Sequence, residues 1–229
     1  MKITLPLGSL ALATAPFVYA HYRFKSLIID GQETEDWKYV RESDNDYYPI
    51  EDVASMSMRC NSGGANGNHT ETATVKAGDT VGFGLSQAIF HKGPLNVYMS
   101  KVDNAKTADG SSGWFKMYEI PPILDGGKSV IWPAVNLTKV TFPLPKTIES
   151  GDYLLRIEQI GLHLAIDKYA AQFFISCAQL RVTGGGSARP STVMFPGVYK
   201  DTDPGLWINI YEPVPTNYTM PGPALFQDS

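Results

Sequence analysis

Two of the four histidines in this chain stand out as candidate metal ligands because of their positions. His21 follows a segment, residues 1–20, that has a lysine near its start, an apolar middle and the small-residue ending Val-Tyr-Ala. That pattern predicts a secretion signal peptide, and its removal after Ala20 would make His21 the first residue of the mature chain. An N-terminal histidine offers two nitrogen ligands, its α-amino group and a ring nitrogen. A second imidazole would complete a three-nitrogen site of the kind that suits copper.

His91 is the natural second imidazole for such a site. It lies in the sequence Ile-Phe-His-Lys-Gly-Pro, residues 89–94, where a Gly-Pro turn can hold the ring rigidly at the start of the next strand. On these residues alone an alternative stays open, since His21 could simply be the first residue of a secreted protein. His163 could likewise be a core histidine that donates to a carbonyl group, and His69, in a loop rich in glycine and asparagine, is expected to be solvated.

The elements that must position these side chains are short strands. Turn residues such as Asp-Gly, Ala-Gly-Asp and Ser-Gly-Asp separate runs that are too short for typical helices, and the pattern predicts a β-sandwich with long loops. The expected strands cover residues 22–29, 72–76, 80–85, 95–102, 114–119, 140–144, 153–161 and 172–183. The expected loops, where a binding surface would be built, cover residues 36–65, 105–112 and 187–229.

Alternation along the strand predicted for residues 172–183 adds a further candidate to the site. It places Gln172 and Phe174 on one face of the strand and Cys177 on the other. A metal near Phe174 would therefore have Gln172 on the same side.

Composition and charge narrow the class of protein. Residues 21–229 are enough for one domain with a single core. No apolar run after residue 20 is long enough to span a bilayer, so we expect a secreted protein that is not anchored to a membrane. The formal net charge of −4 argues against nucleic acid as a partner and leaves a neutral polymer open.

Cysteines and sequons are consistent with the secretory pathway. Cys60 and Cys177 are the two cysteines, and a disulfide would persist outside the cell, with two free buried thiols as the alternative. Three Asn-X-Thr triplets are candidate glycosylation sites, at Asn68, Asn136 and Asn217.

Several motifs, taken together and in order, resemble fungal lytic polysaccharide monooxygenases of auxiliary activity family nine. The resemblance spans residues 21–229, and several motifs at appropriate spacings are far more specific than any single one. The motifs are His21 directly after the leader, His91-Lys92-Gly93-Pro94, the segment 151–163, the block 172–179, the segment 202–211 and the segment 218–223.

The resemblance implies a fold, an activity and partners. The fold would be all-β, an immunoglobulin- or fibronectin III-like β-sandwich whose long loops form a flat substrate face. The activity would be oxidative cleavage of glycosidic bonds in cellulose or related β-glucans, with an external electron donor and oxygen or hydrogen peroxide. The cofactor would be one copper ion in a type 2 site, and the secreted protein would be a monomer.

The resemblance also assigns roles residue by residue. His21 would supply the α-amino group and a ring nitrogen, and His91 the third nitrogen. His163 and Gln172 would position the oxygen species, and Tyr218 would lay its ring against sugar units. The disulfide of the family would be formed by Cys60 and Cys177.

One departure from the family keeps other functions open. Phe174 occupies the axial position where relatives usually carry a tyrosine, so no hydroxyl reaches the copper axis there. A copper-binding or copper-handling protein that does not oxidise polysaccharide is therefore one alternative, and a carbohydrate-binding module that uses aromatic residues alone is another. Tyr218 could equally be a packed residue of the tail. A hydrolase with a pair of carboxylates is disfavoured, because the acidic residues lie mainly in turns and loops.

Overall fold

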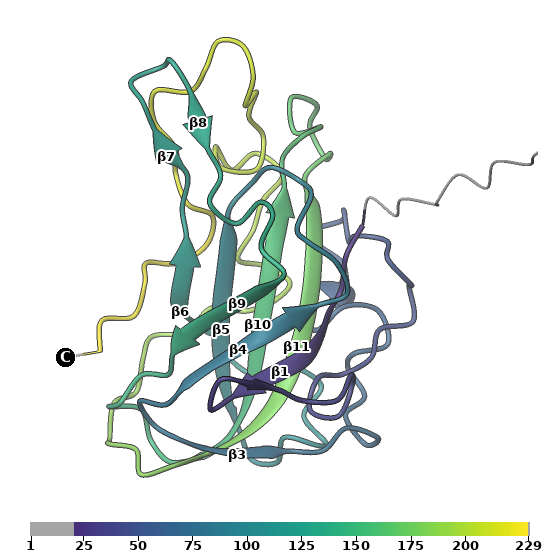
Figure 1. Ribbon diagram of the computed structural model, residues 1–229, viewed down its shortest axis with the longest axis vertical. Helices are drawn as coiled ribbons and strands as arrows, with labels where there is room; N and C mark the ends of the chain where they lie inside the picture. The colour runs from purple at the N-terminus through teal and green to yellow at the C-terminus, as the bar shows by residue number, and fades with distance from the viewer. Residues whose placement is uncertain (1–20, 229) are drawn as a thin grey trace, which may run out of the picture.

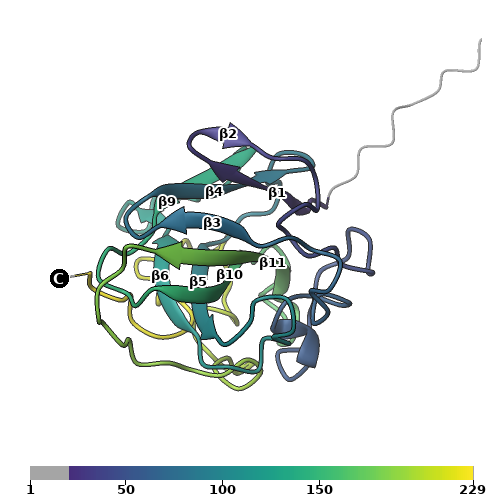
Figure 2. The same ribbon diagram turned by 90° about the horizontal axis from the view of Figure 1, so that it is seen from below.

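The computed structural model describes residues 21–228, which form two packed β-sheets and a small hairpin (Figure 1). The expected leader, residues 1–20, and Ser229 lie outside the described residues. The four-stranded sheet has the order β2 (Gln32–Glu33), β1 (Phe24–Ile29), β4 (Thr80–Leu85) and β9 (Lys139–Pro143). The five-stranded sheet has the order β3 (Ala73–Lys76), β11 (Gln172–Thr183), β10 (Gly151–Gly161), β5 (Leu95–Val102) and β6 (Phe115–Ile120). Figure 2 shows the first sheet stacked on the second, so the predicted β-sandwich is confirmed.

All eight predicted strands are present, each within two residues of its expected bounds. The sequence pattern missed β2, the hairpin of β7 (Ile123–Leu124) and β8 (Val130–Ile131), and the 3₁₀-helix η1 (Met56–Met58). Elements of two or three residues are too short to show a period, which explains these omissions. No α-helix occurs within residues 21–228, and this part of the chain contains no helix suited to crossing a membrane.

The buried side chains form two clusters, one on each face of the five-stranded sheet. The cluster between the sheets includes Phe174 and Ala178, and the cluster under the long loops includes Phe173 and Cys177. Successive residues of a strand point to opposite faces, and the alternation predicted for β11 is confirmed. The central strands β5, β10 and β11 are therefore buried on both faces.

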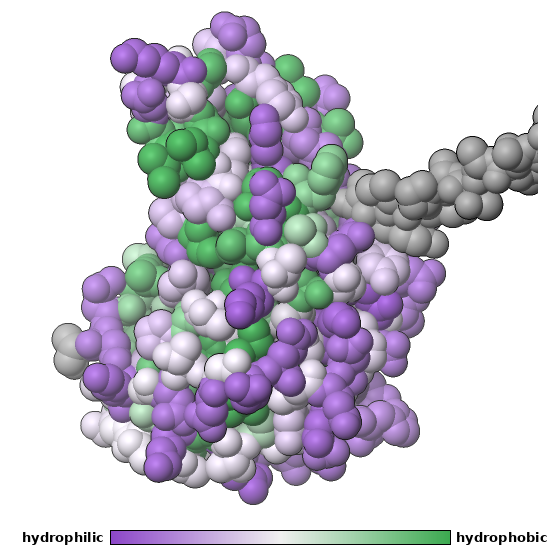
Figure 3. All heavy atoms as spheres, viewed as in Figure 1, coloured by the Kyte–Doolittle hydropathy of each residue, from purple (hydrophilic) through white to green (hydrophobic). Residues whose placement is uncertain are grey.

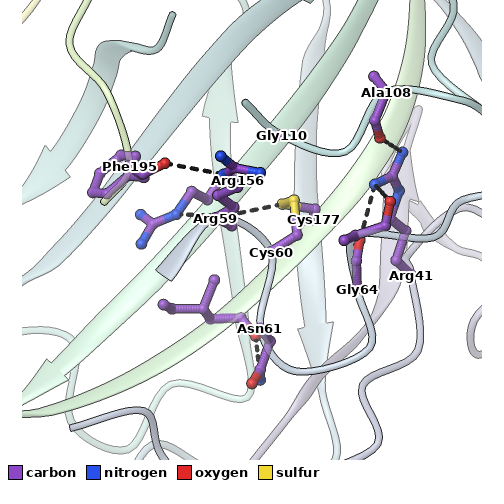
Figure 4. The surroundings of a disulfide bond; sticks show 12 residues. Arg41, Arg59, Cys60, Asn61, Gly64, Ala108, Gly110, Arg156, Cys177 and Phe195 are labelled. Atoms are coloured by element: carbon purple, nitrogen blue, oxygen red, sulfur yellow. Dashed lines mark hydrogen bonds between the residues drawn. A yellow bond between two sulfur atoms is a disulfide. The ribbon is translucent and has the colours of Figure 1, made fainter. Parts of the chain in front are cut away.

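The long loop between β2 and β3 is attached to β11 at three points. Residue pairs Val40 with Ala178 and Ile50 with Phe173 form isolated β-bridges. The disulfide that the resemblance implied is present between Cys60 of this loop and Cys177 of β11 (Figure 4). A disulfide across 117 residues of sequence is expected to stabilise the fold by limiting the unfolded chain. The loop is consequently held along the first part of the strand, from Phe173 to Ala178.

The face of the molecule drawn in Figure 3 is mainly hydrophilic. Hydrophobic side chains gather at its upper left, where Figure 1 places the hairpin of β7 and β8. Ile123 and Ile131, which are paired across this hairpin, are both exposed. The tip of the hairpin packs against the carboxy-terminal segment, because a Cβ atom at Gly127 would lie 3.0 Å from Cγ2 of Thr216.

Candidate metal centre

Three rings from distant parts of the sequence meet at one end of the sandwich. The ring centroids of His21 and His91 are 5.5 Å apart, and the Phe174 ring is 5.7 Å from His21 and 5.5 Å from His91. His21 lies just before β1, His91 lies just before β5, and Phe174 belongs to β11. The structure thus brings together the two predicted ligands and the residue predicted to lie beside them.

A close approach of two backbone segments holds His91 in place. Gly93 has a φ of +151°, and a Cβ atom there would lie 1.7 Å from the carbonyl oxygen of Ile160. Only glycine fits this position, which explains the Gly-Pro turn that follows the histidine. The side-chain amide of Gln159 also donates to the backbone carbonyl of His91 at 3.1 Å.

The electrostatics of His91 favour a neutral imidazole. Its side chain is buried, and burial, followed by the charges of His163 and His21, lowers its pKa to about 4. Its Nε2 atom is buried and has no hydrogen-bond partner. A neutral ring with an unpaired lone pair at neutral pH is the form that binds a metal ion.

The residues next to His21 hold the start of the chain against the sandwich. The Gln87 side chain donates to the backbone carbonyl of His21. The Tyr22 ring stacks on Phe174 with centroids 4.6 Å apart, and its hydroxyl donates to Gln159. Burial raises the pKa of Tyr22 well above its ordinary value, so this hydroxyl stays protonated and keeps its hydrogen bond. His21 is therefore fixed through its neighbour and its own carbonyl.

His163 and Gln172 extend the cluster on the His91 side. The His163 ring stacks on the His91 ring with centroids 3.9 Å apart and an interplanar angle of 7°. Burial, and then the charge of His21, lowers the pKa of His163. Gln172 pairs with Gly161 at the end of the β10–β11 ladder. Both residues keep a buried polar atom without a partner, Nδ1 of His163 and Oε1 of Gln172.

Gly161 lies where these side chains meet. A Cβ atom added there would be 3.2 Å from Cβ of His91, 3.4 Å from Nδ1 of His163 and 3.5 Å from Cε2 of Phe174. The glycine therefore leaves the space in which the imidazoles and the phenyl ring pack. The arrangement places His163 next to the predicted ligand His91, which in turn lies beside His21.

Other predicted residues lie outside this ring cluster. Tyr218 is partly buried, packs edge-on against Trp132 at 5.4 Å and donates its hydroxyl to the carbonyl of Gly205 at 2.7 Å. Burial raises its pKa. His69 is exposed, as predicted. The three candidate glycosylation residues are exposed as well: Asn68, Asn136 and Asn217.

Sequence reasoning missed two exposed tyrosines beside the site. Tyr48 is 69% exposed, and its ring centroid is 6.2 Å from that of His21. Tyr211 is 48% exposed, and its hydroxyl donates to the backbone carbonyl of His163 at 3.3 Å. Tyr211 ends the motif Ile-Asn-Ile-Tyr, so a signal for it was present, whereas the position of Tyr48 in a long loop gave none.

The cluster fits a metal that takes nitrogen ligands. Within residues 21–228, no group of three or more His, Cys, Asp or Glu side chains could hold a metal ion. A site made of two imidazoles and an α-amino group does not require a third such side chain. A buried nitrogen without a partner is unfavourable in a folded protein unless a ligand uses it, and Nε2 of His91 is such an atom. Imidazole nitrogen suits copper among several transition metals.

Known proteins resemble the whole described chain. The model of Auxiliary Activity family 9, formerly GH61, matches residues 21–218. AA9 family lytic polysaccharide monooxygenase H of Malbranchea cinnamomea is 48% identical over 98% of this chain and 99% of its own length. AA9 family lytic polysaccharide monooxygenase C of Emericella nidulans is 49% identical over 96% of this chain and 95% of its own length. The crystal structure of HiLPMO9B superposes with a TM-score of 0.80 at 32% identity, covering 90% of this chain and all of that one. The chain therefore belongs to Auxiliary Activity family 9.

Proposed function

We propose that this protein is a secreted, copper-dependent lytic polysaccharide monooxygenase. It cleaves glycosidic bonds in cellulose or a related β-glucan by oxidation, with an external electron donor and oxygen or hydrogen peroxide. Relatives that match nearly the whole chain carry that enzyme name. The proposal rests on the proximity of His21 and His91, whose ring centroids are 5.5 Å apart. Nε2 of His91 is buried there without a hydrogen-bond partner.

Maturation completes the site in this proposal. Residues 1–20 are removed as a signal peptide, and residues 21–229 remain as one catalytic domain. The family match that begins at residue 21 supports this boundary. In the uncleaved chain the nitrogen of His21 belongs to a peptide bond and is a poor metal ligand. Cleavage turns it into an α-amino group. This group would then bind copper together with the ring nitrogens of His21 and His91.

The chain's own residues would hold one copper ion and shape its surroundings. His21 and His91 would provide the nitrogen ligands, and Phe174 lies beside both rings with a side chain that has no atom able to ligate copper. The bound copper supplies one-electron redox chemistry toward oxygen or hydrogen peroxide. Rings packed around the ligands fix their orientation and limit the access of water, which is how surrounding residues tune a metal site.

His163 and Gln172 would bind the oxygen co-substrate. Their buried atoms without partners, Nδ1 of His163 and Oε1 of Gln172, are available for hydrogen bonds to it. His163 is also held by stacking on His91 and by the hydrogen bond from Tyr211 to its carbonyl. The His163 ring can therefore act without moving, as a positioned group at an active site must.

Exposed rings near the histidines support a polysaccharide as the substrate. Tyr48 and Tyr211 border His21 and His163, and sugar rings stack on aromatic faces of this kind. We propose Tyr218 as a third ring of a flat substrate face. Its hydroxyl is already bonded to Gly205, so Tyr218 would contribute a ring face to the sugar contact. A monomer without nucleic acid or membrane partners is the form proposed to act.

Product analysis tests this function. Copper-loaded mature protein and its His91→Ala variant would be incubated with a reductant on cellulose, xyloglucan and other β-glucans, and the products measured by mass spectrometry. Oxidised oligosaccharides are expected from the wild type and not from the variant. Equal products from both would contradict the proposal.

Phe174 supports a second candidate function, a copper-binding or copper-handling protein on the same scaffold. A phenyl ring beside the two histidines would supply neither a polar contact to the copper nor a redox-active hydroxyl. Tight copper binding by the wild type without oxidised products on any substrate would favour this second function. Weak copper binding without products would instead favour a carbohydrate-binding module.

A further inference from the structure

We propose that Glu51 is a positioning residue that sets the orientation of the Gln172 side-chain amide. The inference rests on the proposed function, because it concerns the group that would bind the oxygen co-substrate. It begins with one contact, a hydrogen bond of 2.9 Å from Nε2 of Gln172 to Oε1 of Glu51. Glu51 belongs to the long loop between β2 and β3, far from Gln172 in the sequence.

The backbone places the two side chains next to each other. Ile50 and Phe173 form an antiparallel bridge in which each backbone N–H donates to the other residue's carbonyl, at 2.9 and 2.8 Å. In an antiparallel pair the residue after one partner lies opposite the residue before the other. Glu51 therefore lies opposite Gln172, and side chains of such a cross-strand pair share one face. The pairing of the main chain therefore places the two side chains within reach of each other.

The chemistry of the contact fixes the amide. An ionised carboxylate only accepts hydrogen bonds, so it selects the NH₂ end of an amide and rejects the oxygen end. With Nε2 bonded to Glu51, the acceptor Oε1 is the atom of Gln172 that has no partner. Gln172 is only 8% exposed, so water has little access to that oxygen. Glu51 thus determines that Gln172 offers an acceptor to a ligand.

Removing the Glu51 carboxylate should leave the orientation of the Gln172 amide unfixed. The Glu51 side chain is exposed, so its truncation opens no cavity in the core. Without an acceptor at residue 51, the Gln172 amide can rotate by half a turn and exchange the oxygen for the NH₂ group. The variant would then keep every group predicted to touch copper or oxygen and would change only the orientation of one amide.

Nuclear magnetic resonance of the metal-free protein reports the hydrogen bond from the Gln172 amide to Glu51. The side-chain ¹⁵N–¹H signals of Gln172 are identified by their loss in Gln172→Ala. They are expected to shift in Glu51→Ala and to shift less in Glu51→Gln, whose amide oxygen can still accept the hydrogen bond. The matched control is Glu42→Ala, which truncates another exposed glutamate of the same loop and should leave these signals in place. Unshifted signals in Glu51→Ala would overturn the proposal.

The copper-loaded protein gives the second readout. Glu51→Ala is expected to lower turnover about tenfold, the usual size for an outer partner of a metal site, while copper affinity stays unchanged and the Cu(II) electron paramagnetic resonance spectrum shifts. Because Glu51 acts through Gln172, the double variant Glu51→Ala/Gln172→Ala should be no slower than Gln172→Ala alone. Additive losses would overturn the positioning role. A wild type without oxidised products would refute the proposed function instead, and the resonance experiment would still decide the role of Glu51.

Discussion

Two buried glutamines on β11 differ in how their side-chain amides are hydrogen-bonded. Gln179 has both ends of its amide bonded, since Oε1 accepts from Nε of Arg41 at 3.0 Å and Nε2 donates to the carbonyl of Thr70 at 2.9 Å. Gln172, seven residues earlier, bonds Glu51 through Nε2 and leaves Oε1 buried without a partner. Buried polar groups in folded proteins are normally paired. The difference therefore separates a structural glutamine from one with a free group for a ligand.

The surroundings of Gln179 show what a purely structural cluster looks like. The Arg41 guanidinium is fully buried and donates to the backbone carbonyls of Gly64, Ala105 and Ala108 (Figure 4). Burial lowers the pKa of Arg41 to about 10, and Asp109 acts in the opposite direction, so the group stays charged at neutral pH. Each nitrogen of this group has a partner. The cluster joins two loops to the sheet and offers nothing to a ligand.

The largest expected effect is on copper binding at the candidate metal centre of His21 and His91. His91→Ala removes an imidazole ligand and should weaken copper binding about 1,000-fold, or about 4 kcal/mol. His69→Ala removes an exposed imidazole and should change the affinity by less than about twofold. Isothermal titration with Cu(II) measures both, and circular dichroism checks that the sandwich stays folded. Equal losses in the two variants would place the site elsewhere.

The disulfide provides the largest expected effect on stability. Replacing Cys60 and Cys177 together by alanine should lower the free energy of unfolding by about 3 kcal/mol, because the unfolded chain gains freedom. Copper affinity of the folded variant should not change, since the disulfide lies on the face of β11 away from Phe174. Denaturant unfolding gives the first value and copper titration the second. A folded variant that binds copper poorly would show that the two regions are coupled.

The two glutamines provide a matched pair of variants whose expected effects on the free energy of unfolding are smaller. Gln179→Ala leaves buried groups of Arg41 and Thr70 without partners and should cost about 2 kcal/mol of unfolding free energy. Gln172→Ala leaves only the exposed Glu51 carboxylate without its donor and should cost less than about 1 kcal/mol, while it slows turnover. Urea unfolding and product formation measure the two effects. The distinction fails if Gln172→Ala destabilises the fold as much as Gln179→Ala does.

A small effect on affinity, together with a change in reactivity, is expected for Phe174→Tyr. The added hydroxyl would lie beside the copper, so it should change copper affinity by less than about threefold and alter the Cu(II) spectrum and the rate of peroxide-driven turnover. Spectroscopy and a turnover assay on the same preparation test this. If only Phe174→Tyr yields oxidised products, the natural protein is better explained as a copper-handling protein.

The sequence predicted the strands well and the contacts between loops poorly. Alternation along β11 correctly assigned Phe174 and Cys177 to opposite faces, because a strand's period of two is written in neighbouring residues. The resemblance named His21 and His91, which the fold then brought together. Glu51 and Tyr48 gave no signal, since each reaches the site from a long loop whose path depends on distant pairings such as Ile50 with Phe173. The motif of residues 218–223 pointed to Tyr218, but the hydrogen bond from its hydroxyl to the carbonyl of Gly205 depends on tertiary packing.

Copper titration of two forms of the protein tests the central claim, that a mature amino terminus at His21 completes the metal centre. One form begins at His21 and the other carries one additional alanine before it. We predict that the first binds a single Cu(II) ion with three nitrogen ligands in its electron paramagnetic resonance spectrum, and that the second binds at least about 100-fold more weakly, or about 2.7 kcal/mol. Equal affinities and identical spectra for the two forms would contradict the α-amino group as a ligand.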